Sequence, residues 1–389
     1  MEQEKRKYII LLISHSTNTP LTQGRLYFVN IQLNIVNYFV RDIMKILGKN
    51  KTLYIPLSHY SFLLLFTLEF TYYLLILQTG IVEYHHSNMT EIWMIPVGGI
   101  IGIISSIWLY KYASWLMPLA LFIQLLLSID YAQANGAELF ILGYISGLTA
   151  PILIYNIKYL WIAVIGLSFS YALGTLLFHI DAIMRTDIAL TLTLVALFST
   201  LFIHFEKTKL TIATDLTLYS MGSIFLWLLL DASLFETLSR DSYMSLWGDS
   251  HYTFTIILSH SLGLALAYRL REWKYTDATL LILFVVSYFL YDTQEKTLLS
   301  IVYPIVISYY NVIILYKLMK LNYVMLAVMS LSLWGASGLG LFIALSGHFI
   351  LAWVVLFFLV ILILLHNKKY EPLVKNLNQV LHLYKKEIL

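Results

Sequence analysis

Residues 63–78 read LLLFTLEFTYYLLILQ, an apolar run that contains a single acidic residue, Glu69. Similar runs recur along the chain, and an α-helix needs about 20 mostly apolar residues to cross a hydrocarbon core. Over its 389 residues the chain is 59% hydrophobic and only 12% charged, with a mean hydropathy of +0.77. The sequence therefore predicts an all-α membrane protein that crosses the bilayer many times.

Polar breaks divide the apolar runs into twelve predicted spans. Residues 321–365 are almost continuously apolar, and only Ser346-Gly347-His348 could form a hairpin within them. A single helix over these residues would be too long for a bilayer, so we divide them into two spans. A membrane β-barrel is not expected, because its strands alternate apolar and polar residues over about 10 positions. The predicted spans are 60–82, 92–110, 113–129, 138–156, 159–178, 187–205, 215–235, 251–268, 276–292, 297–316, 321–345 and 347–365.

The basic residues predict the orientation of these spans. Lysine and arginine favour the cytoplasmic side of short loops. If the N-terminus is placed inside, the 25 basic residues fall in cytoplasmic segments with three exceptions, Arg185, Arg240 and Lys296. Both termini are therefore predicted in the cytoplasm, and a bacterial cytoplasmic (inner) membrane is the expected location.

The chain is predicted to contain two six-helix halves, because segment 102–122 resembles segment 262–284. In each, a helix rich in small residues runs through a short basic loop into another helix, and Lys111 corresponds to Arg269. Repeats of this size are typical of transporters. The predicted organisation is an N-terminal extension (1–57), a first bundle (58–205), a cytoplasmic linker (206–214), a second bundle (215–366) and a cytoplasmic tail (367–389).

A polar stripe marks the N-terminal extension. Asn30, Asn34, Asn37, Arg41 and Lys45 follow one another at steps of three and four within an otherwise apolar segment. This spacing predicts an amphipathic helix over about 24–47 that lies on the cytoplasmic leaflet. The alternative is a helix docked against the inner face of the bundle.

The fourth predicted span contains Gly143-Tyr-Ile-Ser-Gly147-Leu-Thr-Ala-Pro151, and a basic loop joins the second span to the third. In these features residues 58–366 resemble the major facilitator superfamily of secondary transporters. The resemblance implies that the two halves rock about a central cavity lined by the first, fourth, seventh and tenth helices. It also implies a gating role for Lys111 and Arg269. The loop Leu109–Ser114 departs from the family pattern, since it keeps only one basic residue.

Glu69 is the clearest candidate for chemistry. A charged residue at the bilayer centre costs about 2.5–3.5 kcal/mol, so it rarely faces lipid. Tyr72 and Tyr73, three and four residues later, share its helix face. This face is predicted to bind a proton or a cationic group, and the alternative is a structural hydrogen bond to another helix.

Four other spans carry candidate polar residues. A stripe on the seventh predicts either a cavity wall that ends near an outer gate or close helix packing. His260 in the eighth span is either a proton relay or a packing residue. The candidates are Ser220, Ser223, Trp227 and Asp231 in the seventh span, His260 in the eighth, Tyr303, Tyr309 and Asn311 in the tenth, and Tyr144 and Asn156 in the fourth.

The leading hypothesis is a proton-coupled transporter of a small solute, acting as a monomer or weak oligomer, with no catalytic residue, metal or cofactor. A net charge of +3 gives no indication of a nucleic-acid partner, and the sequence has no cysteine for disulfides or thiolate ligands. One alternative is an enzyme or polymerase of envelope glycans or lipids. Such enzymes generally need a sizeable outer loop that carries arginines and acidic residues, whereas the largest predicted outer loop here, 236–250, is short and contains one arginine, Arg240. Another is a receptor or scaffold built on a transporter fold.

Overall fold

The computed structural model describes residues 56–81, 89–206, 217–241, 243–347 and 350–366, in which every regular element is a helix. The predicted amphipathic helix at 24–47, most of the linker and the C-terminal tail lie outside the described residues.

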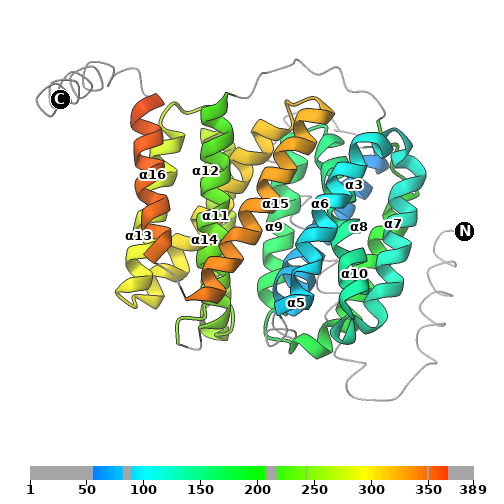
Figure 1. Cartoon of the computed structure of the whole chain (residues 1–389), viewed down its shortest axis with the longest axis horizontal. Coiled ribbons are helices and arrows are strands. Elements are labelled where there is room, and N and C mark those ends of the chain that lie inside the picture. Colours follow the sequence, from blue (N-terminus) through cyan, green and yellow to red (C-terminus); the bar gives the residue numbers. More distant parts are fainter. Residues whose placement is uncertain (1–55, 82–88, 207–216, 242, 348–349, 367–389) are drawn as a thin grey trace, which may run out of the picture. The chain divides into compact units, whose positions relative to one another are not determined.

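The first predicted bundle begins with α3, which continues directly as a π-helix, η1 (Figure 1). Short 3-10 turns separate several of its helices. Its elements are α3 (Leu57–Tyr72), η1 (Tyr73–Gly80), α5 (Met89–Ile92), α6 (Met94–Leu109), η2 (Tyr110–Tyr112), α7 (Ala113–Leu127), η3 (Ser128–Gln133), α8 (Gly136–Tyr155), α9 (Leu160–Leu177), η4 (Ala182–Arg185) and α10 (Thr186–Thr200).

The second predicted bundle also consists of long helices joined by short connections. Its elements are α11 (Leu218–Arg240), η5 (Ser250–Tyr252), α12 (Thr253–Leu270), α13 (Thr276–Asp292), α14 (Lys296–Leu318), α15 (Tyr323–Ser346) and α16 (Ile350–His366).

Nine helical stretches in the described part of the chain are long and apolar enough to cross a membrane. One of them, Met94–Tyr131, is 38 residues long. Helices of this length and composition need a hydrocarbon environment. The chain is therefore an integral, multi-pass membrane protein.

Local sequence explains where several helices begin and end. The Asn135 side chain accepts hydrogen bonds from the backbone at the start of α8, and Glu138 completes a capping box. The Asn322 side chain caps α15 in a similar way by accepting from the Met325 N–H. At the other end of α15, Gly347 adopts a left-handed φ of 68°, which ends the helix where the sequence predicts a break.

Glycines bring α6 and α8 into backbone contact. A Cβ atom on Gly102 would lie 2.1 Å from the carbonyl oxygen of Tyr144, and one on Gly147 would lie 2.1 Å from that of Gly99. Small residues at a crossing let two helices approach closely, which is how membrane helices associate. Here the glycines are needed for close packing.

The remaining packing follows a pattern of helix pairs. In the first bundle α6 packs on α8, α3 on α9 and α10, and α7 on α10. In the second, α12 packs on α14, α11 on α15 and α16, and α13 on α16. Contacts between α6 and α15 and between α9 and α12 join the two groups.

Candidate functional site

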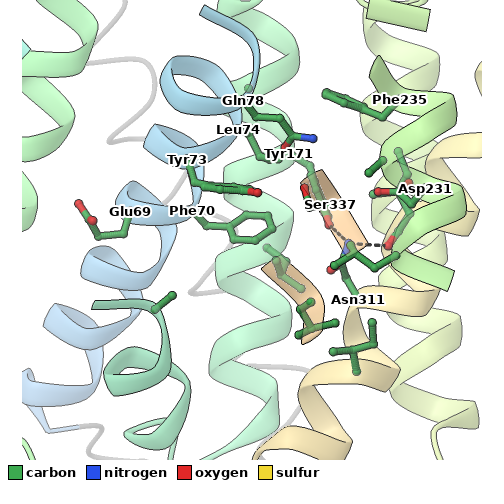
Figure 2. A pocket seen from close by; sticks show the side chains of 18 of the residues that line it. Glu69, Phe70, Tyr73, Leu74, Gln78, Tyr171, Asp231, Phe235, Asn311 and Ser337 are labelled. Carbon is green, nitrogen blue, oxygen red and sulfur yellow. Dashed lines mark hydrogen bonds between the residues drawn. The ribbon is translucent and has the colours of Figure 1, made fainter. Parts of the chain in front are cut away.

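A cavity of about 270 Å³ lies among eight helices, namely α3 with its η1 extension, α6, α8, α9, α11, α12, α14 and α15. Most of its wall is apolar and aromatic. Polar side chains, including Asp231 and Asn311, reach it at a few points, as Figure 2 shows. Apolar cavities with a few convergent polar groups are the usual form of a small-molecule site.

Asp231 of α11 is the acidic group most firmly built into this cavity. It is only 7% exposed. The Tyr303 hydroxyl donates to its Oδ1 at 2.9 Å, and the Tyr310 hydroxyl donates to its Oδ2 at 2.5 Å. Because both oxygens accept hydrogen bonds, the arrangement suits an ionised carboxylate. The tyrosines fix the orientation of the charge.

Next to Asp231, polar contacts connect α9, α12 and α14. Asn311 Nδ2 donates to the Tyr171 hydroxyl at 2.8 Å, and the Tyr171 ring stacks on His260 with centroids 4.3 Å apart. His260 Nδ1 and the Ser308 hydroxyl are hydrogen-bonded at 2.8 Å. Figure 2 shows Tyr171, Asn311 and Asp231 on facing helices. These contacts join α9 of the first predicted bundle to α12 and α14 of the second.

Glu69 lies at the opposite margin of the cavity. Gln124 Nε2 of α7 donates to its Oε1 at 3.2 Å and to the Thr193 hydroxyl of α10 at 3.3 Å. In Figure 2 the Glu69 side chain points away from Asp231. The structure thus shows the hydrogen bond to another helix that was the alternative to a proton site, and it also keeps Glu69 among the lining residues.

Tyr72 and Tyr73, predicted on one face with Glu69, have different surroundings. The Tyr72 hydroxyl is hydrogen-bonded to Ser128 at 2.8 Å, and this side chain does not line the cavity. Tyr73 does line it, with its ring centroid 6.0 Å from that of Trp334 on α15. Tyr73 is also the first residue of the π-helix, and such irregularities in α-helices are frequent at functional sites.

The cavity takes in some of the other predicted residues and leaves out others. Asn156 instead directly follows α8, where its side chain donates to the Ile152 carbonyl at 2.8 Å and accepts from the Glu206 N–H at 2.7 Å. Lys111 and Arg269 are exposed at helix ends. Of the candidates, Glu69, Tyr73, Asp231, His260 and Asn311 line the cavity, whereas Tyr72, Tyr144, Asn156, Ser220, Ser223, Trp227, Tyr303 and Tyr309 do not.

An aromatic cluster lies at one end of the cavity, here named the Trp247 cluster. Trp247 belongs to the segment that connects α11 to α12. Its ring centroid lies 4.8 Å from that of Phe235, 6.1 Å from that of Tyr303 and 6.4 Å from that of Phe178. Trp247 is 5% exposed. Phe178, Phe235 and Trp247 also line the cavity, so the cluster narrows it at this end.

A second aromatic group, the Tyr323 cluster, lies at the other helix ends. Tyr323 begins α15, and its ring stacks on Tyr110 at 4.0 Å and contacts Tyr155 edge-on at 5.2 Å. Tyr155 ends α8 whereas Phe178 follows α9, and these consecutive helices run in opposite directions. The two clusters therefore lie at opposite ends of the helices.

No protein-family model matches this chain, and no curated protein sequence matches it. The resemblance to the major facilitator superfamily accordingly stays an expectation from the sequence.

Sequence reasoning missed Arg185, which it placed in an outer loop. Its side chain is buried at 1% exposure. The guanidinium donates to the carbonyl oxygens of Leu75, Ile180 and Phe178 and to the Thr79 hydroxyl, at 2.7–3.2 Å. Leu75 belongs to the π-helix, and its carbonyl oxygen also accepts a hydrogen bond from the Thr79 hydroxyl. No local sequence pattern indicates the contacts with Leu75 and Thr79, because these two acceptors lie more than 100 residues away in the chain.

Several cavity residues were also missed because they are aromatic or uncharged and resemble ordinary membrane-facing residues. Only their position between helices distinguishes them. Among the described residues, no group of three or more histidine and acidic side chains could hold a metal ion. The missed lining residues include Phe70, Gln78, Tyr171, Phe235, Trp334 and Ser337.

Proposed function

We propose that this chain is a secondary active transporter that moves a small solute by alternating access, with the helix arrangement of the major facilitator superfamily. The observation that carries the proposal is the position of the cavity. Its walls come from helices of both predicted bundles, and Asp231 is one of the residues that line it. Substrate sites of secondary transporters lie between structural repeats near the middle of the membrane.

Twelve spans are part of this proposal. The 38-residue stretch Met94–Tyr131 is interrupted at η2, and α6 and α7 are separate helices in Figure 1. Helices α13 and α16 contain 17 residues each and are apolar enough to serve as short spans. Counting them gives an even number of crossings, which agrees with the basic-residue bias that places both termini inside.

The packing pattern supports two related halves. The pairs α3–α9, α6–α8 and α7–α10 correspond in chain order to α11–α15, α12–α14 and α13–α16. The same correspondence exchanges two of the contacts that join the halves, α6–α15 and α9–α12. Such a relationship is expected for two structural repeats that rock against each other.

The aromatic clusters supply the two gates of this proposal. The Tyr323 cluster joins Tyr110 and Tyr155 of the first half to Tyr323 of the second, on the predicted cytoplasmic side. The Trp247 cluster joins Phe178 to the second half on the outer side. Aromatic pairs contribute about 0.5–1.5 kcal/mol each beyond area burial, so contacts of this kind can break and re-form during rocking. The tyrosines stand where the family usually has charged loop contacts.

Proton coupling completes the proposal. Glu69 and Asp231 are the two acidic residues that line the cavity. Each is contacted by neutral hydrogen-bond donors, so each can exchange a proton without breaking an ion pair. Intramembrane carboxyl groups that line a cavity commonly act in proton relays.

The test begins with an untargeted comparison of metabolites in cells that lack or overproduce the protein. The solute it identifies is then offered to proteoliposomes under an imposed pH gradient. We expect solute-dependent proton flux that Glu69→Gln and Asp231→Asn each reduce, while Asp181→Asn, at an exposed loop position, leaves it unchanged. Turnover of a lipid-linked substrate in detergent, without any gradient, would instead support the enzyme alternative.

A further inference from the structure

We infer that the cavity binds an organic cation with an aromatic or apolar body. The transport part of this inference rests on the proposed function, whereas the binding part stands on the cavity itself. Three features of the cavity carry it, namely its charge, its aromatic walls and the fixed position of Asp231.

The wall of the cavity contains acidic side chains. Glu69 and Asp231 line the cavity, and no lysine or arginine does so among the described residues. The buried Arg185 donates to backbone carbonyls and to the Thr79 hydroxyl. Arg240 is paired with Glu236 at 2.7 Å. Neither arginine lines the cavity beside Asp231.

Aromatic rings cover much of the rest of the wall. Tyr73 of η1 and Trp334 of α15 approach each other with centroids 6.0 Å apart. Phe70 meets Tyr171 edge-on at 5.8 Å, and the Tyr171 hydroxyl accepts a hydrogen bond from Asn311. A cation within about 6 Å of a ring face is attracted by the ring quadrupole, and this attraction grows when water is excluded.

The two tyrosines that hold Asp231 leave part of its accepting capacity free. A carboxylate has about four lone-pair sites, and Tyr303 and Tyr310 contact one oxygen each. A bound cation would pair with the carboxylate. A neutral ligand would leave the buried carboxylate without a partner of opposite charge. An anionic ligand would be repelled by the carboxylate. The cavity therefore discriminates by charge as well as by shape.

The probes for the test share a two-ring skeleton and differ in charge. They are N-methyl-4-phenylpyridinium, the neutral 4-phenylpyridine at pH 8, and biphenyl-4-carboxylate. Equilibrium dialysis with the purified full chain in detergent measures each dissociation constant. We expect the cation to bind about tenfold more tightly than either analogue, as one charge-assisted contact allows. Equal or tighter binding of the neutral or anionic probe would overturn the inference.

Variants locate the effect. Asp231→Asn should weaken cation binding about tenfold and remove the preference over 4-phenylpyridine, whereas Asp231→Glu, which keeps the charge, should retain the preference. Asp181→Asn is the matched control, because it makes the same chemical change at an exposed position. If Asp231→Asn kept the full preference for the cation over 4-phenylpyridine, the inference would be contradicted. If this variant fails to fold, the relative affinities of the three probes for the unchanged chain still test the inference.

Uptake of the same cation by proteoliposomes separates this inference from the proposed function. Binding without gradient-driven uptake would leave the cation site standing and argue against transport. Gradient-driven uptake of an anionic metabolite, with no binding of the cation, would leave transport standing and refute the cation site.

Discussion

The rings of Tyr110 and Tyr323 stack with centroids 4.0 Å apart and an angle of 15° between their planes. Tyr110 lies in the turn after α6, and Tyr323 is the first residue of α15. The stack therefore joins the first predicted half to the second at the end of the helices. If the halves rock, this contact must open whenever the cavity faces that side.

Cross-linking tests this requirement, and the natural chain contains no cysteine to interfere. The double variant Tyr110→Cys, Tyr323→Cys should form a disulfide on oxidation and lose solute uptake in proteoliposomes, because the gate can no longer open. Reduction should restore uptake. The control is Tyr110→Cys with Tyr155→Cys, since these rings lie 6.3 Å apart within the first half. Full uptake by the oxidised inter-half variant would show that this contact is not a gate.

The Tyr310 hydroxyl should contribute to stability through Asp231. Tyr310→Phe removes the donor to Oδ2 and changes little else in the side chain. Hydrogen bonds to charged groups contribute about 1.5–3 kcal/mol, so we expect a clear fall in melting temperature in detergent. Tyr243→Phe is the control, because Tyr243 is 65% exposed. Equal melting temperatures for both variants would mean that the buried carboxylate does not depend on this donor.

The crossing of α6 and α8 should tolerate no added methyl group. An alanine at Gly147 would place Cβ 2.1 Å from the Gly99 carbonyl oxygen, so the helices must separate. Overpacking of this kind costs about 1–3 kcal/mol. Gly147→Ala should therefore lower the melting temperature, whereas Gly335→Ala, with no atom within 4 Å of the new Cβ, should not. A stable Gly147→Ala protein would show that the crossing can relax.

Asp241, just beyond α11, should make stability depend on pH. Burial opposes ionisation of Asp241, but hydrogen bonds from the Met244 and Tyr243 N–H groups and from the Tyr291 hydroxyl outweigh it and lower the pKa of the carboxyl group. A lowered folded-state pKa stabilises the protein above the unfolded value, which is about 3.9 for aspartate, and this contribution is lost as the pH falls through the folded pKa.

Melting temperatures of the natural chain and of Asp241→Asn, measured between pH 7 and pH 3, check this expectation. The natural chain should be more stable at neutral pH, and the difference should shrink below about pH 4. In the control Asp181→Asn, where the carboxylate is exposed, no such difference is expected. A gap that widens toward low pH would contradict the assigned direction.

Much of the helical layout could be predicted because each span must satisfy its backbone internally and bury apolar side chains in lipid. The predicted span 159–178 is α9 at Leu160–Leu177, and 113–129 is α7 at Ala113–Leu127. The π-helix at Tyr73–Gly80 was not predicted, since its sequence is as apolar as that of an ordinary span. Twelve crossings and the cytoplasmic termini stay predictions.

The cavity was harder to predict. Asp231, His260 and Asn311 stood out because polar groups in apolar runs are costly unless they find partners. Tyr171 and Trp334 did not, because aromatic residues are common throughout this sequence. Trp227 and Ser223 have the helical spacing that would place them on one face with Asp231. They are buried on α11 but do not line the cavity.

The sequence by itself determined that the chain is helical and membrane-embedded, because hydrocarbon accepts only long apolar segments with satisfied backbones. Only the tertiary structure decided which polar groups meet. Tyr310 reaches Asp231 from another helix, and Gln124 holds Glu69 from a third. Such contacts depend on the rotation and crossing angle of each helix. The sequence of one helix does not specify which face of a neighbouring helix will contact it.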